Sequence, residues 1–303
     1  MTSPSPAAPP PTAVAPSFLR GLAFVLCSAL CFGLLDASGK WLSRDHHVLQ
    51  VVWARYFFAV LVLVPWMGRT GVAAAFRSAR PGLQIVRAGI LAATSIMFFF
   101  AIRFIQLAEA QAISFVAPLV VTALAALVLR EHVGPRRWAA VFVGFVGVLV
   151  IIRPGAGVMH WAAGIVLLQA VLGAGYHLLT RFLAAHDPAR VTFMFTGMVG
   201  AVLFSVLAPF VWSAPTPLHW AMMVTMGVFG TVGHWCLIQA YRYAEASSLA
   251  PFLYASLPWV TLLGWIVFGD LPDRWTVVGA AIVIASGIYV FYRERHLRRI
   301  GRI

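Results

Sequence analysis

Residues 110–129 read AQAISFVAPLVVTALAALVL, an apolar run that contains no charged side chain. A helix needs about 20 mostly apolar residues to cross the hydrocarbon core of a bilayer, and this run meets that length. It lacks the alternating polarity that marks the strands of a membrane barrel. The run therefore predicts a membrane-spanning helix with Pro118 inside it.

Further apolar runs extend this pattern on both sides. Only 10% of the residues are charged and 61% are hydrophobic, whereas a soluble protein has about 25% charged residues. The composition therefore predicts an all-α polytopic membrane protein with ten transmembrane helices. The predicted spans are residues 21–41, 51–67, 83–104, 110–129, 138–152 (a short run expected to continue into its flanks), 161–181, 191–212, 220–241, 247–268 and 275–292.

The basic residues give these spans an orientation. The formal net charge is +13, and most Lys and Arg lie between apolar runs, which favours a lipid bilayer over nucleic acid as the partner. With the N-terminus in the cytoplasm, 16 of the 22 Lys and Arg fall on the cytoplasmic side, in agreement with the positive-inside rule. Both termini are therefore predicted inside. Residues 1–17 are expected to form a disordered tail, and residues 294–303 a basic cytoplasmic tail.

The two halves of the chain resemble each other when the sequence is shifted by 139 residues. Arg103 then falls on Arg242, and Phe115 falls on Tyr254. These matches indicate two five-helix repeats, at residues 18–154 and 155–293. Because five is odd, the second repeat must enter the membrane from the opposite side, which makes the pair inverted. Folds of this kind place the substrate between the repeats and alternate access by moving one repeat against the other.

Several short motifs add a family resemblance that covers nearly the whole chain after the tail. In the first half these are residues 108–110 (AEA), 115–119 (FVAPL), 129–131 (LRE), 144–147 (GFVG) and 153–155 (RPG). In the second half they are residues 178–181 (LLTR), 240–244 (AYRYA), 250–252 (APF) and 264–270 (GWIVFGD). With these motifs the chain resembles the drug/metabolite transporter superfamily in its ten-helix EamA-type branch. The resemblance implies transport of metabolites, often efflux, across the bacterial inner membrane. Asp270 stands where the family often carries Glu, and this change keeps the charge.

Prolines suggest where a solute would bind. Pro118 interrupts the fourth span, and Pro251 and Pro258 interrupt the ninth, its counterpart in the repeat. Spans broken by Pro at corresponding positions of two halves point to a transporter binding site. The alternative is that Pro only kinks packed helices and that the neighbouring aromatic residues fill core space. The candidate binding residues are Ser114, Phe115, Tyr254 and Trp259 beside the breaks, together with Tyr176, His177, His234 and Trp235.

Ionisable residues inside the spans are candidates for coupling or gating, because a charge in the bilayer is costly and usually faces protein or water. Asp36 and Lys40 have the spacing of a helical salt bridge, which would make them a structural pair. Alternatively, Asp36 binds a cation, a proton or a substrate amine. In the second half His177 and Arg181 fall on these two positions. Glu109 begins a span, where the helix dipole stabilises an acid.

The sequence predicts no enzyme, metal site or cofactor. It contains no phosphate loop, no nucleophile elbow and no His-Glu-x-x-His pattern. A secondary transporter of a metabolite, amino acid or drug-like solute is the prediction. A membrane enzyme acting on lipid or acyl substrates is the alternative, with Asp36, His46 and His47 as its only hint. A channel lacks a polar stripe to line its pore. Pairing into a homodimer stays open.

Overall fold

The computed structural model describes residues 17–75, 77–128, 134–153, 161–184, 186–244 and 246–299. Ten helical stretches among these residues are long and apolar enough to cross a membrane. This number confirms the sequence prediction. The sixteen residues at the start of the chain, the junction between the predicted repeats at 154–160 and residues 300–303 lie outside the described ranges.

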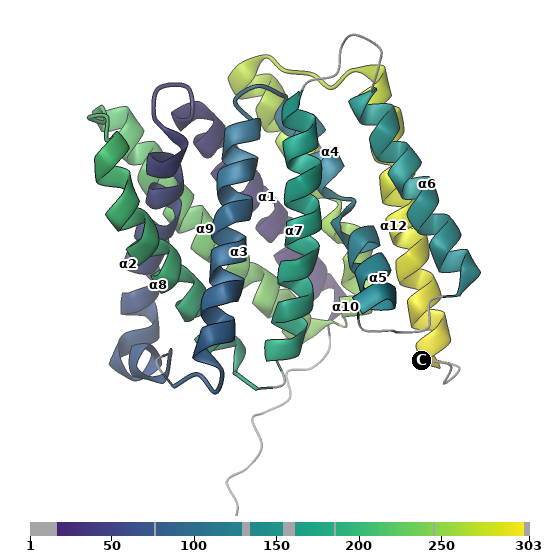
Figure 1. Cartoon of the computed structure of the whole chain (residues 1–303), viewed down its shortest axis with the longest axis horizontal. Coiled ribbons are helices and arrows are strands. Elements are labelled where there is room, and N and C mark those ends of the chain that lie inside the picture. Colours follow the sequence, from purple (N-terminus) through teal and green to yellow (C-terminus); the bar gives the residue numbers. More distant parts are fainter. Residues whose placement is uncertain are drawn as a thin grey trace, which may run out of the picture.

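The helices follow one another along the chain with short links between them (Figure 1). Their bounds are α1 Phe18–Leu42, α2 Val48–Ala75, α3 Pro81–Ala101, α4 Leu107–Ser114, α5 Ala117–Val128, α6 Pro135–Ile152, α7 Trp161–Leu183, α8 Ala189–Leu207, the 3-10 turn η1 Ala208–Val211, α9 Pro217–Tyr243, α10 Ala246–Leu253, α11 Ser256–Leu263, the π-helical turn η2 Gly264–Phe268 and α12 Arg274–Arg299. α2 contains a sharp break at Gly68, where φ is 64°. α12 extends past the predicted span and includes part of the basic tail.

Two of the ten spans are broken, and they are the two that carry the predicted Pro breaks. The fourth span divides into α4 and α5 after Ser114, four residues before Pro118. The ninth divides into α10 and α11 after Leu253, close to the residue four positions before Pro258. A Pro ring clashes with the carbonyl four residues earlier and donates no hydrogen bond to it, so the helix ends there. Pro251 lies inside α10.

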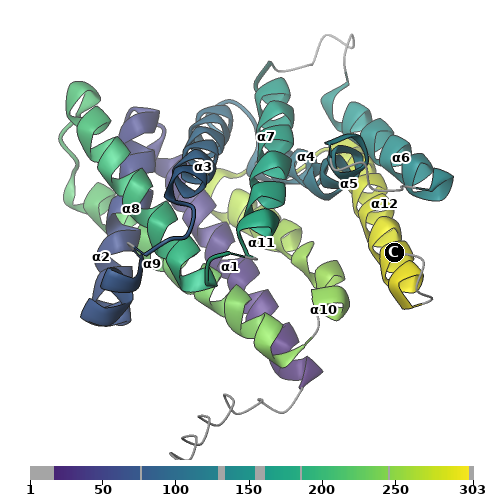
Figure 2. The same cartoon turned by 60° about the horizontal axis from the view of Figure 1, so that its bottom comes forward.

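The packing of the helices is related by a twofold pattern. α1 packs along α9 and α7 along α3, which are equivalent pairs when the two halves are exchanged. α2 packs on α8, α4 on α11 and α6 on α12, each joining a span to its own counterpart. α6 and α12 lie side by side at one edge of the molecule in both views (Figure 2). The pattern is that of two five-span repeats.

Small residues allow the closest of these contacts. A Cβ added at Gly227 would collide with the backbone and side chain of Phe58 in α2. Additions at Gly230 and Gly233 would lie 2.9 Å and 3.0 Å from side chains of α1. The glycines of α9 therefore form a helix-packing face, a purpose that small residues serve in many membrane proteins. Across the same interface the sulfur atoms of Cys27 and Cys236 are 3.6 Å apart.

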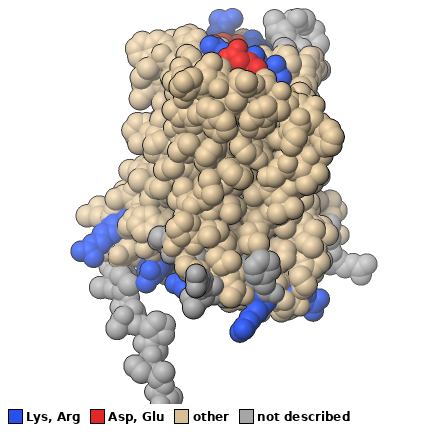
Figure 3. Space-filling model, turned by 90° about the vertical axis from the view of Figure 1, so that its left-hand side faces the viewer, with Lys and Arg blue, Asp and Glu red and all other residues tan. Residues whose placement is uncertain are grey.

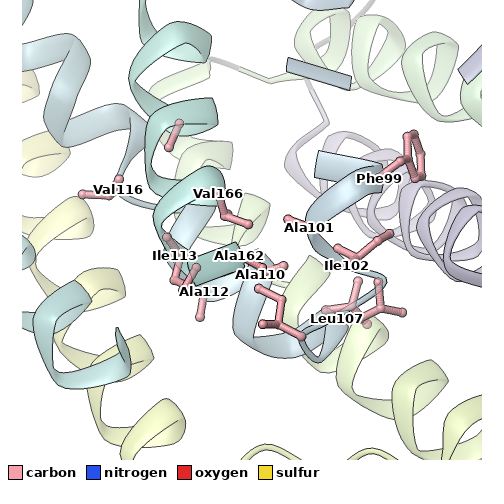
Figure 4. Close-up of a cluster of buried hydrophobic side chains, with 14 of the residues drawn as sticks. Phe99, Ala101, Ile102, Leu107, Ala110, Ala112, Ile113, Val116, Ala162 and Val166 are labelled. Carbon is pink, nitrogen blue, oxygen red and sulfur yellow. The ribbon is translucent and has the colours of Figure 1, made fainter. Parts of the chain in front are cut away.

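A buried apolar cluster lies where α3 ends and where α4 and α7 begin (Figure 4). Phe99, Ile102 and Ile113 are fully buried in it. The outer surface is apolar as well. On the face seen in Figure 3, Lys and Arg gather toward both ends, Asp and Glu appear at one end, and the broad band between the ends carries no charged side chain. This distribution matches a protein whose middle lies in a bilayer.

Candidate functional site

Two adjoining cavities lie between the two halves of the chain. The central cavity, of about 350 Å³, is lined by helices of both repeats. The link cavity, of about 400 Å³, extends from the middle of α9 to the link between α7 and α8 at residues 184–188. Arg55, Leu91, Tyr176 and His234 line both. Volumes of roughly 300–1,000 Å³ are typical of sites for small molecules.

Polar side chains from both broken spans face the central cavity. Ser114, the last residue of α4, donates from Oγ to the Ala110 carbonyl at 2.9 Å and contacts Gln169 Oε1 at 3.3 Å. Gln111 Nε2 donates to Ser256 Oγ at 3.3 Å and so bridges α4 to α11. The Pro breaks therefore place amide and hydroxyl groups at the cavity, with partners on other helices.

Of the predicted binding residues, four line these cavities. Ser114 and His177 face the central cavity, and Tyr176 and His234 face both. The Nδ1 atom of His234 is 2.8 Å from the Gly230 carbonyl, which fixes Nδ1–H as the donor, and the ring packs between Phe32 and Phe193. His234 is thus a packed residue of α9 that still borders both cavities.

The other four predicted binding residues do not line either cavity. Phe115 and Tyr254 meet edge to face with ring centroids 4.8 Å apart, and the Tyr254 hydroxyl lies against Gly287 of α12. Trp259 lies beside Gly33 of α1, and Trp235 contacts the ring of Phe24. These aromatic side chains join helices around the cavities.

The predicted helical pair of Asp36 with Lys40 was wrong. Lys40 Nζ donates to Asp270 Oδ2 at 2.8 Å and to the Ile105 carbonyl at 2.9 Å, so it joins α1 to two links. Lys40 is only 7% exposed, and a buried ammonium needs several acceptors, which Asp36 alone would not supply. Asp270, which stands where the family often carries Glu, is thereby the partner of Lys40. Asp36 instead faces the central cavity.

The remaining gating candidates lie away from the two cavities. Glu109 is in the first turn of α4, half-buried, where the helix dipole favours an acid. Arg181 is in the last turn of α7 and is exposed. Neither residue lines the central cavity or the link cavity.

Sequence reasoning missed two arginines that do line the cavities. Arg55 lies in α2 and Arg87 in α3, both within spans. Arg87 is 2% exposed, and its guanidinium donates to Tyr176 Oη at 2.8 Å, Thr180 Oγ1 at 3.1 Å and the Thr192 carbonyl at 2.8 Å. The signal was available, because an arginine inside an apolar run is costly and usually functional. Both residues were instead counted only toward orientation.

One end of the link cavity is tied by Asp187, in the link between α7 and α8. Its carboxylate accepts hydrogen bonds from Ser78 Oγ at 2.6 Å, the Ala79 backbone at 2.8 Å and Gln84 Nε2 at 2.8 Å. Burial acts to raise the pKa of Asp187, but these donors outweigh it and hold the pKa below its ordinary value. We call this contact the Asp187 clamp. It joins the α7–α8 link to the start of α3.

A second clamp ties the equivalent links at the opposite end of the bundle. His46, between α1 and α2, contacts Ser213 Oγ through Nδ1 at 2.5 Å and His219 Nδ1 through Nε2 at 2.8 Å. His219 Nε2 is 3.4 Å from Asp45 Oδ2, and Gln50 exchanges hydrogen bonds with the Ser213 backbone. Burial lowers the pKa of His46, and His219 lowers it further against the opposing effect of Asp45. We call this contact the His46 clamp.

Comparisons with known proteins agree on one kind of molecule. The sequence pattern of the EamA-like transporter family matches residues 19–153 and again residues 160–292. A riboflavin transporter of Vibrio cholerae is 26% identical over 94% of this chain and 97% of its own length. An S-adenosylmethionine uptake transporter of Rickettsia prowazekii is 24% identical over 92% and 95% of the two chains.

Two further similarities complete the comparison. The pseudopaline exporter CntI of Pseudomonas aeruginosa is 27% identical over 88% of this chain and 94% of its own. A solved crystal structure superposes with a TM-score of 0.61 at 18% identity, covering 92% of this chain and 97% of that one, and shows the same fold.

Proposed function

We propose that this chain, which belongs to the EamA-like transporter family, is a secondary-active transporter that carries a small metabolite across the bacterial inner membrane by alternating access between its two inverted repeats. That it is a multi-pass transporter of small solutes, and not an enzyme, follows from the family and from relatives with transporter names along nearly their full length. The mechanism, the site and the direction are the proposal.

The observation that carries the mechanism is the central cavity, to which both repeats contribute helices. The first repeat supplies α1, α2, α3 and α4, and the second supplies α7, α9, α10 and α11. A site formed between inverted repeats is exposed to one side or the other when one repeat rocks against its mate. The cavity therefore lies where a solute could be passed from side to side without an open pore.

The proposed binding residues are those that face the cavities. Ser114, Tyr176, His177 and His234 would contact the solute, and Asp36 would respond to a cation or a proton. Phe115, Tyr254, Trp259 and Trp235 would hold the broken and facing helices in register. Pro118, Pro251 and Pro258 would keep the two broken spans open beside the site.

We propose export as the direction of flow. The link cavity extends toward the α7–α8 link, on the side that the basic residues predict to be cytoplasmic. At the other end, the Lys40–Asp270 ion pair joins α1 to the link before α12, and a separate cavity of about 480 Å³ lies beside it without sharing a lining residue with the central cavity. A conformation open in this manner would load its solute from inside the cell. Names among the relatives include both uptake and export, so direction is measured separately.

The test is solute exchange in proteoliposomes made with the full chain. Vesicles loaded with an unlabelled solute should accumulate the labelled form from outside, tested with riboflavin, S-adenosylmethionine and a panel of amino acids and metabolites. Protein-free vesicles are the control. Exchange of one or more solutes supports the proposal. Chemical turnover of a lipid or acyl substrate in detergent, with no exchange of any solute in the panel, would contradict it.

A further inference from the structure

Arg55 is the arginine that lines both the central cavity and the link cavity among the described residues. It lies in α2 within a membrane span and is half-buried. Its charge lies 5.7 Å from the ring centroid of Tyr56 and 5.8 Å from that of Phe99. Tyr176 and His234 complete an aromatic surround at the junction of the cavities.

Among the described residues, the guanidinium of Arg55 makes no hydrogen bond and no ion pair with a carboxylate. Asp36 lines the same cavity, and its charge acts on Arg55 only across a longer separation than that of an ion pair. Aromatic faces attract a cation but do not satisfy the five donors of a guanidinium. A charged group in this position usually pairs with another group or lines a path for a solute.

Arg87 provides an internal comparison. It is more deeply buried than Arg55, and its guanidinium donates to neutral acceptors of α7 and α8. It adds a positive charge to the link cavity, and the acid of that cavity, Asp187, is already engaged by three donors. Among the described residues that line the link cavity there are thus two guanidinium groups and one carboxylate, and that carboxylate already accepts three hydrogen bonds.

We propose that Arg55 binds an anionic oxygen group, a carboxylate or a phosphate, on the transported solute, and that the aromatic surround receives a flat organic body attached to it. The inference rests on the proposed function, and it narrows the solute to organic anions or zwitterions. A planar guanidinium binds such groups through two parallel hydrogen bonds, which a lysine cannot reproduce. Binding then gives the Arg55 guanidinium an anionic group as its hydrogen-bond acceptor.

The experiment measures binding of matched probe pairs to the full chain in detergent by equilibrium dialysis. Phenylacetate is compared with phenylacetamide for the carboxylate, and riboflavin 5′-phosphate with riboflavin for the phosphate. The wild type is compared with Arg55→Gln, with Arg55→Lys and with Arg274→Gln. Arg274 is an exposed arginine outside both cavities and is the matched control. Elution as a single species and an unchanged melting midpoint establish folding.

The acid of at least one pair should bind the wild type and Arg274→Gln about tenfold or more tightly than its neutral partner. Arg55→Gln should abolish this preference, and Arg55→Lys should reduce it. Equal binding of acid and neutral forms in both pairs, or a preference that survives in Arg55→Gln, would overturn the inference. If Arg55→Gln does not fold, an undiminished preference in Arg55→Lys overturns it instead.

Vesicle exchange separates this inference from the proposed function. Exchange of riboflavin, together with equal binding of acids and neutral partners, would refute the role of Arg55 and leave the transporter intact. An acid preference that depends on Arg55, without exchange of any solute, would support the anion site and count against transport.

Discussion

Arg87 holds three helices together with a single side chain. It leaves α3 and donates to α7 through Tyr176 and Thr180, and to α8 through Thr192 and Thr196. Its guanidinium also stacks over the Tyr176 ring, 4.8 Å from the centroid. A buried cation with so many partners contributes to the assembly of the bundle as well as to the charge of the link cavity.

Replacing Arg87 by Gln should therefore destabilise the protein by about 3 kcal/mol, because several buried acceptors lose their donor. The measurement is the melting midpoint in detergent, compared with Arg136→Gln, which removes an exposed arginine at the start of α6. A midpoint as high as that of the control variant would show that Arg87 makes no net contribution to stability.

At the scale of residues, the sequence predicted which polar residues matter better than it predicted which residues they contact. It pointed to Asp36, Lys40, His177 and His234 because polar side chains in apolar runs are conspicuous. It assigned Lys40 to Asp36 because only neighbours along one helix are visible in a sequence. The true partner, Asp270, lies 230 residues away, and such a contact depends on how α1 meets the link before α12.

The broken spans are the elements that give the site its polar groups. Pro118 lies in the first turn of α5, where its missing donor costs little, and the chain between α4 and α5 is a tight turn at Phe115 and Val116. Pro118→Ala would restore a donor for the Ser114 carbonyl and allow the two helices to fuse. We therefore attribute the break between α4 and α5 to the Pro118 side chain.

We expect Pro118→Ala to keep or raise the melting midpoint while lowering the rate of solute exchange about tenfold, because Ser114 and Gln111 would turn away from the cavity. Pro135→Ala is the matched control, since residue 135 begins α6, where a backbone N–H has no partner within the helix. Exchange at the wild-type rate in Pro118→Ala would remove the break from the mechanism.

The Asp187 clamp joins two links and should respond to acid in a defined direction. Because its folded pKa lies below the ordinary value of 3.8, the clamp contributes stability that is present above that value and is lost as the pH falls through the folded pKa. Stability attributable to Asp187 should therefore be constant from pH 7 to pH 5 and decline in stronger acid.

The measurement is the difference in melting midpoint between the wild type and Asp187→Asn across this range. The difference should be constant near neutral pH and shrink below about pH 4. Asp45→Asn, at the opposite end of the bundle, is the comparison variant. A difference in melting midpoint that grows as the pH falls would contradict this prediction, because it would mean that the protonated Asp187 stabilises the fold more than the carboxylate does.

The elements themselves were the most predictable part of the molecule. Each predicted run corresponds to a span, because exposing about 20 apolar residues to water costs far more free energy than burying them in the bilayer. The two Pro breaks followed from backbone chemistry alone. The break in α2 at Gly68 lies one residue beyond the predicted end of the second span at residue 67, but the helix that continues after it to Ala75 was not predicted.

For the whole molecule, the distribution of basic residues predicts the side on which each end lies, and this prediction can be tested directly. A cysteine replacing Ala214, in the link before α9, should react with a membrane-impermeant maleimide in intact cells, and one replacing Arg136 should react only after lysis. Both are made in a chain from which Cys27, Cys31 and Cys236 have been removed. The reverse labelling pattern would show that the protein has the opposite orientation in the membrane.

The twofold relation between repeats was visible in the sequence only as scattered matches, because apolar helices tolerate many substitutions. Its consequence in space, that α1 meets α9 while α3 meets α7, required the structure. The cavity residues Arg55 and Arg87 were missed for a related reason. A positive charge near the end of a run looks the same in sequence whether it faces the water or the centre of the bundle.

The two clamps occupy equivalent links, but the His46 ring and the Asp187 carboxylate become protonated at different pH values. The His46 ring is neutral at pH 7, since its pKa is lowered, and its clamp is fully present above the ordinary histidine value of 6.5 and is lost as the pH falls below it. The Asp187 clamp is unaffected in that interval. An acid compartment on the His46 side would therefore weaken the contacts at one end of the bundle and leave those at the other end unchanged, so that the two ends would differ in stability across a pH gradient.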